Sequence, residues 1–374
     1  MSGIGRATVV GLLAALLATA CGGAAPAASP GGASAAPEPA AARASTGASV
    51  SATSPSTAAA DATSAALGRP KEAITFAIPD HSLNYIVPIT AAAKGFFNEA
   101  GLDVEILPMP SNLTVAALQR GDLQLTGSGG SAVRAAVQGA PFKLVSFMTQ
   151  RPTYFLMTVP ELRSPSQLPG ARVGVNGIGG TLQFFTEMYA RQQGIDPGQI
   201  VFVALGSNPV QHIAAMQAGA LDAAVFDPGS AAVAENQGFS LLQALGEVIS
   251  DPQQGIVATD DYTQRSPGSI QAFLKALVRA LLFVKQNQAE VAAIAQQELG
   301  HEMDEATARR ALQLYADAIS AEAPGYADEK QLQAFYEYDV RVPLELPADQ
   351  PIPPKHDFRF LLAAYDELGI PRPR

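Results

Sequence analysis

The chain has few residues that could form covalent or metal links. Among its 374 residues there is one cysteine, which excludes an internal disulfide framework, and no Cys/His cluster has zinc spacing. A chain of this length buries a large apolar core without such links and is long enough for two domains. We therefore expect no metal site and no cofactor.

Basic charge and long apolar runs are also scarce. There are 24 Lys and Arg against 34 Asp and Glu, a net charge of −10, and no run of basic residues offers contacts to phosphates. Nucleic-acid binding is therefore not expected. The most apolar stretch of the later chain, residues 272–284, carries Lys275 and Arg279, so we expect it to stay in a protein core rather than span a bilayer.

Residues 1–20 have the pattern of a secretory signal peptide. The uncharged stretch Ala7–Ala20 is shorter than the ~20 residues of a membrane-spanning helix, and it ends in small residues. It leads into Leu17-Ala-Thr-Ala-Cys21-Gly, which resembles a bacterial lipobox, with Ala18 at the place where Leu is usual. The resemblance implies lipidation of Cys21. The alternative is an ordinary signal peptide beside an unmodified cysteine.

Residues 21–68 have the composition of a linker. Ala, Ser, Pro, Gly and Thr supply 41 of the 45 residues from 22 to 66, and Val50 is the only large apolar residue there. Such a segment cannot bury enough apolar surface to offset the entropy of ordering, and its prolines interrupt any long helix. We expect a disordered tether that keeps the folded part outside the cytoplasm, anchored to the cell membrane by lipid.

From Ile74 onward the sequence predicts two similar α/β halves. Strand-like apolar runs alternate with amphipathic helical stretches, and the order recurs about 98 residues later; the best local match is Ala117–Leu125 against Ala215–Ala223. Two βαβαβ halves imply two lobes with ligand-facing loops at the carboxyl ends of their strands. We expect lobe 1 over 69–151, lobe 2 over 152–248, and a return segment with C-terminal helices over 249–374, packing mainly on lobe 1.

Within these lobes we expect one helix over 86–100, a crossing through 143–159, a return crossing near 239–248 and a strand over 256–261. The later helices are expected from Ser266-Pro267 onward and near 290–299, 304–321, 328–338 and 358–368.

Several motifs resemble one family. Gly95-Phe-Phe with Gly101-Leu-Asp-Val-Glu, Leu168-Pro-Gly-Ala-Arg-Val-Gly-Val175 and Met216-Gln-Ala-Gly-Ala-Leu-Asp222 are similar to motifs of the ABC-transporter substrate-binding proteins for sulfonates, nitrate, taurine and thiamine-pyrimidine precursors. The resemblance covers roughly residues 71–300. It implies a two-lobed, type II periplasmic-binding-protein-like fold and a monomer that passes a small polar solute to an ABC permease and its ATPase.

The loops offer two kinds of ligand contact. The Gly-rich loop Asn176–Thr181 precedes a helix, whose free N–H groups can receive an anionic or carbonyl group; a tight turn is the alternative. Asp80 and Asp227 follow strands of opposite lobes, and two carboxylates there argue against a bare oxyanion such as nitrate. With His81, Tyr85 and Phe226 nearby, they favour a small ligand that carries N–H donors. The alternatives are that both Asp residues cap helices and that His81 is a solvated loop residue.

The expected ligand contacts all lie in loops or helix starts at the presumed cleft. They are Asp80, His81, Ser82, Asn84, Tyr85, Ser111, Ser128, Asn176, Gly179, Thr181, Ser207, Phe226 and Asp227.

Catalysis has little support. There is no G-x-S-x-G elbow and no zincin motif, and Asp260 and Asp261 are expected on opposite faces of a strand, where they cannot form an acid/base pair. Two alternatives use the same fold: a biosynthetic enzyme of the pyrimidine-precursor or menaquinone-pathway type, and a ligand-sensing ectodomain.

Overall fold

A computed structural model describes residues 71–299 and 303–373, all within one structural unit, residues 66–374. The predicted signal peptide, the linker and Cys21 lie outside the described residues.

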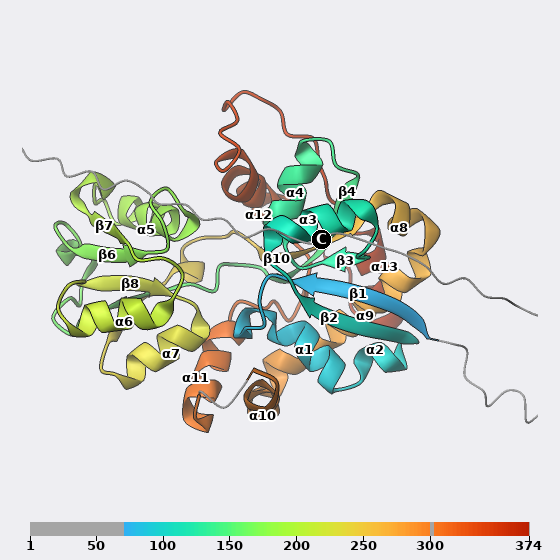
Figure 1. Ribbon diagram of the computed structural model, residues 1–374, viewed down its shortest axis with the longest axis horizontal. Helices are drawn as coiled ribbons and strands as arrows, with labels where there is room; N and C mark the ends of the chain where they lie inside the picture. The colour runs from blue at the N-terminus through green and yellow to red at the C-terminus, as the bar shows by residue number, and fades with distance from the viewer. Residues whose placement is uncertain (1–70, 300–302, 374) are drawn as a thin grey trace, which may run out of the picture. The chain divides into compact units, whose positions relative to one another are not determined.

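The first sheet has the strand order β2-β1-β3-β10-β4 (Figure 1). Strands β1, β2 and β3 are parallel, whereas β10 is antiparallel to β3 and β4. The strands are β1 (Glu72–Ile78), β2 (Leu102–Pro108), β3 (Leu125–Thr126), β4 (Phe142–Thr149) and β10 (Gln253–Thr259). The helical segments between them are η2 (Leu83–Tyr85), α1 (Ile86–Ala93), α2 (Phe96–Glu99), α3 (Ser111–Arg120) and α4 (Gly129–Val137). Helices α3 and α4 lie on one side of this sheet, and α1 and α2 on the other (Figure 1).

The second sheet has the order β7-β6-β8-β5-β9, with β5 antiparallel to β8 and β9. Its strands are β5 (Phe155–Thr158), β6 (Arg172–Val175), β7 (Val201–Ala204), β8 (Ala223–Phe226) and β9 (Ser240–Ala244). Its helices are η3 (Pro165–Gln167), α5 (Thr181–Gln192), η4 (Pro197–Gln199), α6 (Pro209–Gln217), α7 (Pro228–Asn236) and η5 (Leu245–Glu247). Both faces are covered, since Leu156 packs in one apolar cluster and its neighbours Phe155 and Met157 pack in another.

The two sheets have the same topology. Each has three parallel strands, then an antiparallel strand that directly follows a crossing from the other sheet, then an edge strand. A residue near the end of the repeated motif makes the same kind of hydrogen bond in both sheets, from its side-chain oxygen to a backbone N–H of the neighbouring parallel strand. Asp222 accepts the N–H of Arg172 on β6, and Gln124 accepts the N–H of Thr75 on β1. The predicted α/β, two-lobed fold is confirmed.

Two segments join the sheets, one before β5 and one after β9. The return crossing was predicted near 239–248, but residues 240–244 form β9, which pairs with β5. The crossing therefore begins only at η5, and that prediction is wrong. The two segments pass closely at Gly246, where an added Cβ would lie 2.2 Å from the carbonyl oxygen of Pro152.

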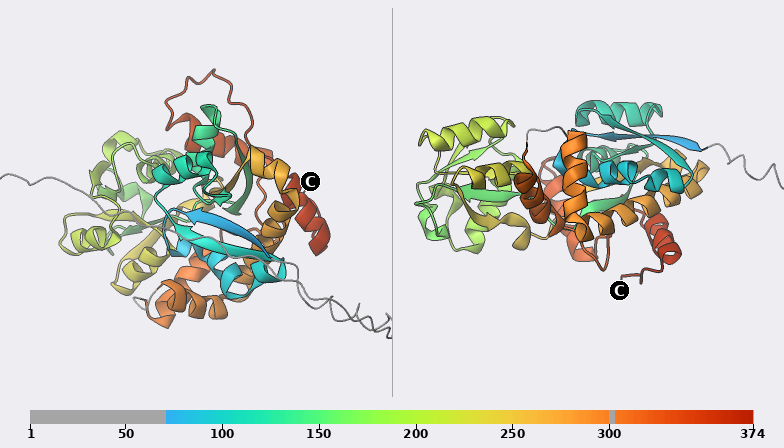
Figure 2. Two further views of the ribbon diagram at one scale, coloured as in Figure 1. Left: turned by 45° about the vertical axis from the view of Figure 1, so that its right-hand side comes forward. Right: turned by 90° about the horizontal axis from the view of Figure 1, so that it is seen from below.

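Most of the C-terminal segment lies beside the first sheet (Figure 2). Its helices are α8 (Asp260–Arg265), α9 (Pro267–Gln286), α10 (Gln288–Leu299), α11 (Glu305–Ala316), α12 (Glu329–Phe335), the π-helical η6 (Tyr336–Arg341) and α13 (Arg359–Leu368). Helix α9 packs against α1 and α13, whereas α11 packs against both α10 and α7 of the second lobe.

Helix α9 is the one helix in the described ranges that is long and apolar enough to cross a bilayer. Half of its apolar window is buried inside this unit, and its charges are paired there, Lys275 with Glu367 at 2.6 Å and Arg279 with Glu99 at 2.8 Å. These contacts are those of a core helix.

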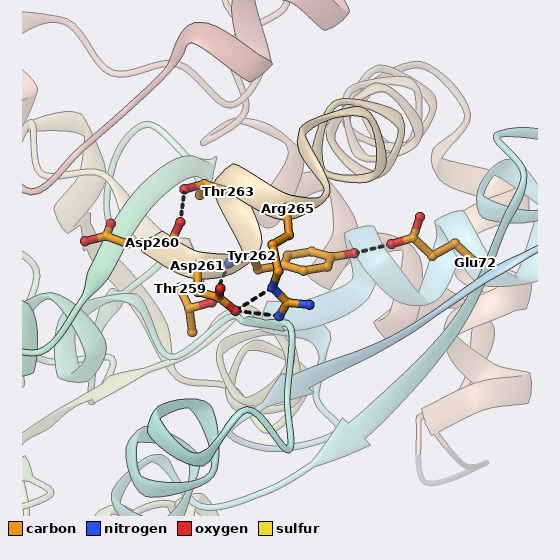
Figure 3. A network of polar contacts seen from close by, with 7 residues as sticks. All are labelled: Glu72, Thr259, Asp260, Asp261, Tyr262, Thr263 and Arg265. Atoms are coloured by element: carbon orange, nitrogen blue, oxygen red, sulfur yellow. Dashed lines mark hydrogen bonds and ion pairs between the residues drawn. The ribbon is translucent and has the colours of Figure 1, made fainter.

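Two element predictions are wrong for local reasons. The helix expected over 86–100 ends at Ala93, because Gly95 has a left-handed φ of 72°, and a new turn starts at Phe96. Asp260 and Asp261 begin helix α8 rather than continuing a strand, because the Thr259 hydroxyl caps the backbone N–H of Tyr262 (Figure 3). Asp261 then binds Arg265 one turn later, and Tyr262 binds Glu72 (Figure 3).

Candidate ligand-binding site

Three neighbouring cavities lie where the strand-end loops of both lobes meet, and we refer to them together as the interlobe cleft. Their volumes are about 290, 350 and 290 Å³. The first and second share Asp80, Asn84 and Tyr154 as lining residues, and the second and third share Arg134, Thr181 and Asp339. The cleft lies at the carboxyl ends of the parallel strands, where open α/β sheets bind ligands.

The structure brings most of the predicted contacts to this cleft. Those that line it are Asp80, Asn84, Tyr85, Ser111, Ser128, Asn176, Gly179, Thr181, Ser207, Phe226 and Asp227. His81 and Ser82 do not line it. The chain turns from β1 into η2 at these two residues, which leaves His81 exposed and Ser82 at the N-cap of η2.

The carboxylate of Asp227 caps helix α7. Its Oδ1 accepts the backbone N–H of Ser230 at 3.0 Å, and its Oδ2 accepts the Ser230 hydroxyl at 2.8 Å. Pro228 at the first helical position suits this cap. Asp227 therefore fulfils the capping alternative while lining the cleft. Asp80 is different, because it is exposed in the loop after β1 and caps no helix.

The loop Asn176–Thr181 uses part of its own N–H donors. Gly179 donates to the Gln183 side chain at 2.9 Å, and Gly180 donates to the carbonyl of Gly177 at 3.2 Å. Gly179 also has a φ of 75°, as the tight-turn alternative requires. The loop is therefore a closed turn that leaves Thr181, the first residue of α5, at the cleft wall.

The electrostatic environment of the cleft is acidic. Burial raises the pKa of the Tyr154 hydroxyl well above its usual value, and negative charges that surround it act in the same direction. Those charges are the carboxylates of Asp339, Asp227, Asp251 and Asp80. Burial likewise raises the pKa of Tyr85, with a further contribution from Asp80. Four carboxylates thus face one small volume.

Two of these carboxylates form a pair, of which Asp251 is fully buried and Asp339 half-buried. Asp251 and Asp339 both interact with the Gln253 side chain, which donates to Asp251 Oδ2 at 3.0 Å and to Asp339 Oδ2 at 3.1 Å. The pKa of each is raised, chiefly by burial; the neighbouring Asp339 raises that of Asp251 further, whereas Arg134 opposes the rise at Asp339. Burial and the neighbouring like charge thus favour the protonated form of Asp251.

A family model described as NMT1/THI5 like matches residues 82–291, which is more than half of the chain. The chain belongs to the NMT1/THI5-like family.

Relatives of this NMT1/THI5-like chain include binding proteins. A Bacillus subtilis (strain 168) protein described as "Putative binding protein YtlA" is 23% identical over 283 residues, which cover 72% of this chain and 84% of the relative. Among solved structures, the periplasmic sulfonate-binding protein SsuA of Methylobacillus flagellatus KT has a TM-score of 0.64 at 16% identity, covering 81% of this chain and 96% of that one.

Other structural neighbours widen the range of activities on this fold. The periplasmic nitrate-binding protein NrtA of Synechocystis PCC 6803 has a TM-score of 0.62 at 15% identity, over 80% of this chain and 90% of that one. The desulfurization enzyme DszB has a TM-score of 0.56 at 15% identity, over 80% of this chain and all of that one. At these identities the likeness shows the fold and leaves the ligand open.

Sequence reasoning missed the part of the cleft that this NMT1/THI5-like chain builds from its later segments. Asp251 lies in the return crossing, and Asp339 lies in the π-helix η6, beyond the expected end of a helix. Arg134 and Tyr154 were also missed. The one signal in the sequence is Asp251-Pro252 before a strand, which parallels Asp227-Pro228 after one.

Proposed function

We propose that this chain is the extracytoplasmic substrate-binding component of an ABC importer. It captures a small polar solute in the interlobe cleft and delivers it to the permease and its ATPase. The observation that carries the proposal is that loops of both lobes line one cleft, because a site shared by two lobes closes when they rotate together. Membership of the NMT1/THI5-like family and the sulfonate- and nitrate-binding neighbours support it.

We propose that the chain divides into two lobes and a C-terminal segment. Lobe 1 comprises residues 69–151, lobe 2 comprises 152–248, and 249–374 form the return segment and the C-terminal helices. Strand β10 of the return segment belongs to the first sheet, and α9 and α13 pack beside that sheet, which supports assigning them to lobe 1.

The proposed location rests on the N-terminal sequence. A signal peptide over 1–20, lipidation at Cys21 and a tether over 21–68 would keep a monomeric receptor on the outer side of the cell membrane. Expression of the Cys21→Ser variant in a bacterial host tests this. The wild-type protein should partition into the membrane fraction and detergent phase, and the variant should be released as soluble protein.

Binding rather than catalysis is proposed because the cleft has no nucleophile and base in contact among the described residues. The Ser111 and Ser128 hydroxyls lie 3.3 Å from each other, and the exposed His81 lies outside the cleft. His212 lines the cleft, and its Nε2 contacts the backbone carbonyl of Gly206 at 2.8 Å. DszB shows that this fold also carries an enzyme, so the enzyme alternative has a clear test. A ligand that is recovered unchanged after prolonged incubation with the protein supports a receptor, and its conversion would favour the enzyme.

A thermal-shift screen tests the proposal directly. The compounds are sulfonates, nitrate, taurine, pyrimidines and amino compounds. A ligand present at 100 times its Kd stabilises the folded state by about 2.7 kcal/mol, which is a clear rise in Tm. The matching structural result is a smaller radius of gyration in X-ray scattering when the same ligand is present. A protein that no compound stabilises or compacts contradicts the proposal.

A further inference from the structure

The acid pair Asp251–Asp339 forms one end of the interlobe cleft. Both residues line the cavity of about 290 Å³ that also contains Thr181 of lobe 2. Asp339 is half-buried and lines the adjoining cavity too. Asp251 is fully buried.

This pair has an unused acceptor. Asp251 Oδ1 has no hydrogen-bond partner within the described part of the chain, although Gln253 occupies Oδ2. A buried polar atom left unpaired is destabilising, so one in a folded protein calls for an explanation, such as a ligand that completes it. A group that donates N–H bonds and enters this cavity would supply the missing donor.

The wall beside the pair is aromatic. The rings of Phe184, on α5 of lobe 2, and Tyr338, on η6, have centroids 4.9 Å apart and line the same cavity. Aromatic faces attract cations and stack on planar groups. The two rings pack against each other and come from different lobes, so a flat ligand that lies against both contacts both lobes.

Part of the donor capacity that could hold an anion here is already used within the protein. Arg134 donates to the backbone carbonyl of Asp339 at 2.7 Å and to the Ser131 hydroxyl at 3.0 Å. The N–H groups of Gly179 and Gly180 donate within their own loop. An anion in this cavity would meet Asp339 and Glu345, which also lines it.

We infer that this end of the cleft binds a planar nitrogen cation, such as an amidinium or guanidinium group. Its two N–H donors would face the Asp251–Asp339 pair, and its flat face would lie against Phe184 and Tyr338. The inference rests on the proposed receptor function and names its ligand class. It differs from the sulfonate and nitrate that the neighbouring structures are named for.

Binding of such a cation should release a proton. The raised pKa values of the pair favour a protonated carboxyl, and a bound cation would take the place of that proton. Affinity should therefore rise with pH through the range in which the pair ionises. The other charged or titratable groups that line these cavities are Arg134, Tyr154, Tyr338, Glu345, Asp80 and Tyr85, and the third cavity adds Asp227 and His212.

Three compounds of nearly the same shape test the charge requirement by isothermal titration calorimetry. Benzamidine is a planar cation, benzamide is its neutral analogue and benzoate is its anionic analogue. Two charge-assisted hydrogen bonds predict that benzamidine binds at least about tenfold more tightly than benzamide. Benzoate should not bind. Titration of the wild-type protein in phosphate and in Tris should show a heat difference that corresponds to released protons.

The Asp339→Asn variant tests the site. It should weaken benzamidine binding at least tenfold and change benzamide binding little, while keeping a wild-type Tm. Asp103→Asn is the matched control. Asp103 is exposed on β2 and does not line the cleft, so this substitution removes the same charge at a site away from the ligand. Equal effects of the two variants would mean that general charge, not the pair, is responsible, and would overturn the inference.

The outcomes separate this inference from the receptor proposal. Benzoate binding more tightly than benzamidine overturns the ligand class. If nitrate or a sulfonate binds and benzamidine does not, the ligand class is also overturned and the receptor proposal remains. If no compound of either series binds, both are overturned.

Discussion

At the scale of single residues, the cleft contains one carboxylate that stabilises the fold and one that destabilises it. Asp227 caps α7 through both of its oxygens. Asp251 is instead fully buried, with one oxygen unpaired. Natural proteins commonly keep such costs at sites where a ligand relieves them. The two residues therefore respond to mutation in opposite ways.

Asp251→Asn should stabilise the protein at neutral pH by about 1 kcal/mol, because it removes a buried carboxyl whose charged form is disfavoured. Burial raises the pKa of Asp251, so the folded state keeps this proton to a higher pH than the unfolded chain does. The resulting stability is complete below the ordinary carboxyl pKa of about 3.9 and is lost as the pH rises through the raised pKa.

Urea unfolding of wild type and Asp251→Asn from pH 4 to pH 8 measures this difference. The two should be close in stability at the acid end, and the wild type should fall below the variant as the pH rises. The Asp261→Asn variant is a control of opposite sign, since Arg265 lowers the pKa of that carboxyl by a hydrogen bond. A difference between wild type and Asp251→Asn that is constant with pH would contradict the assignment.

Asp227 needs two substitutions to separate capping from binding. Asp227→Ala should lower the free energy of unfolding by about 1 kcal/mol, whereas Asp227→Ser keeps a capping oxygen and should cost only a few tenths. We expect both to lose the ligand-induced rise in Tm, because both remove the carboxylate from the cleft. Chemical denaturation with and without a stabilising ligand measures the two effects. Binding that survives in both variants would leave Asp227 a capping residue alone.

At the scale of elements, the sequence predicted what depends on periodicity and missed what depends on contacts between distant segments. The repeated βαβαβ order follows from local apolar patterns. Because the ligand-facing loops follow the strands of this repeat, predicting the repeat also predicted most of the cleft residues. Strand β9 was read as a crossing because its pairing with β5, more than 80 residues earlier, has no local signal. Asp339 lies in a π-helical turn that extends α12, a distortion that helical periodicity does not encode.

The crossings between the sheets give the next prediction. Gly246→Ala places a Cβ against the carbonyl oxygen of Pro152 on the other crossing segment. The backbone of Pro152 cannot move aside as a flexible side chain could. We therefore expect the free energy of unfolding to fall by about 1–3 kcal/mol. Gly268→Ala is the control, because that glycine lies in the first turn of α9 with open space around it. Thermal unfolding compares the two, and equal Tm values would show that the crossings tolerate separation.

At the scale of the whole described unit, the two lobes are joined by more than the crossings. Helix α11 follows helices that pack on the first sheet, yet it contacts α7 of the second lobe. Part of that contact is apolar, since Leu314 of α11 lies in one cluster with Ala231 and Ala234 of α7. Its polar part is formed by Arg310, which binds Glu235 through two nitrogens at 2.7 and 2.8 Å, and by Asn236, which donates to the Thr307 hydroxyl at 2.6 Å. The polar part separates at lower cost than an apolar core does.

Breaking the Arg310–Glu235 pair should therefore change lobe mobility more than stability. Both side chains are partly exposed, so a double-mutant cycle of Glu235→Ala and Arg310→Ala should give a coupling energy of about 0.5–1 kcal/mol. Amide hydrogen exchange should become faster in α7 and α11 and stay unchanged in β1 and β10, which belong to the first sheet. The control pair Arg309–Glu305 lies on α11 alone and should leave α7 unaffected when broken. Faster exchange throughout both sheets would instead show that the pair supports the fold itself, and lobe rotation about the crossings would then need another source of freedom.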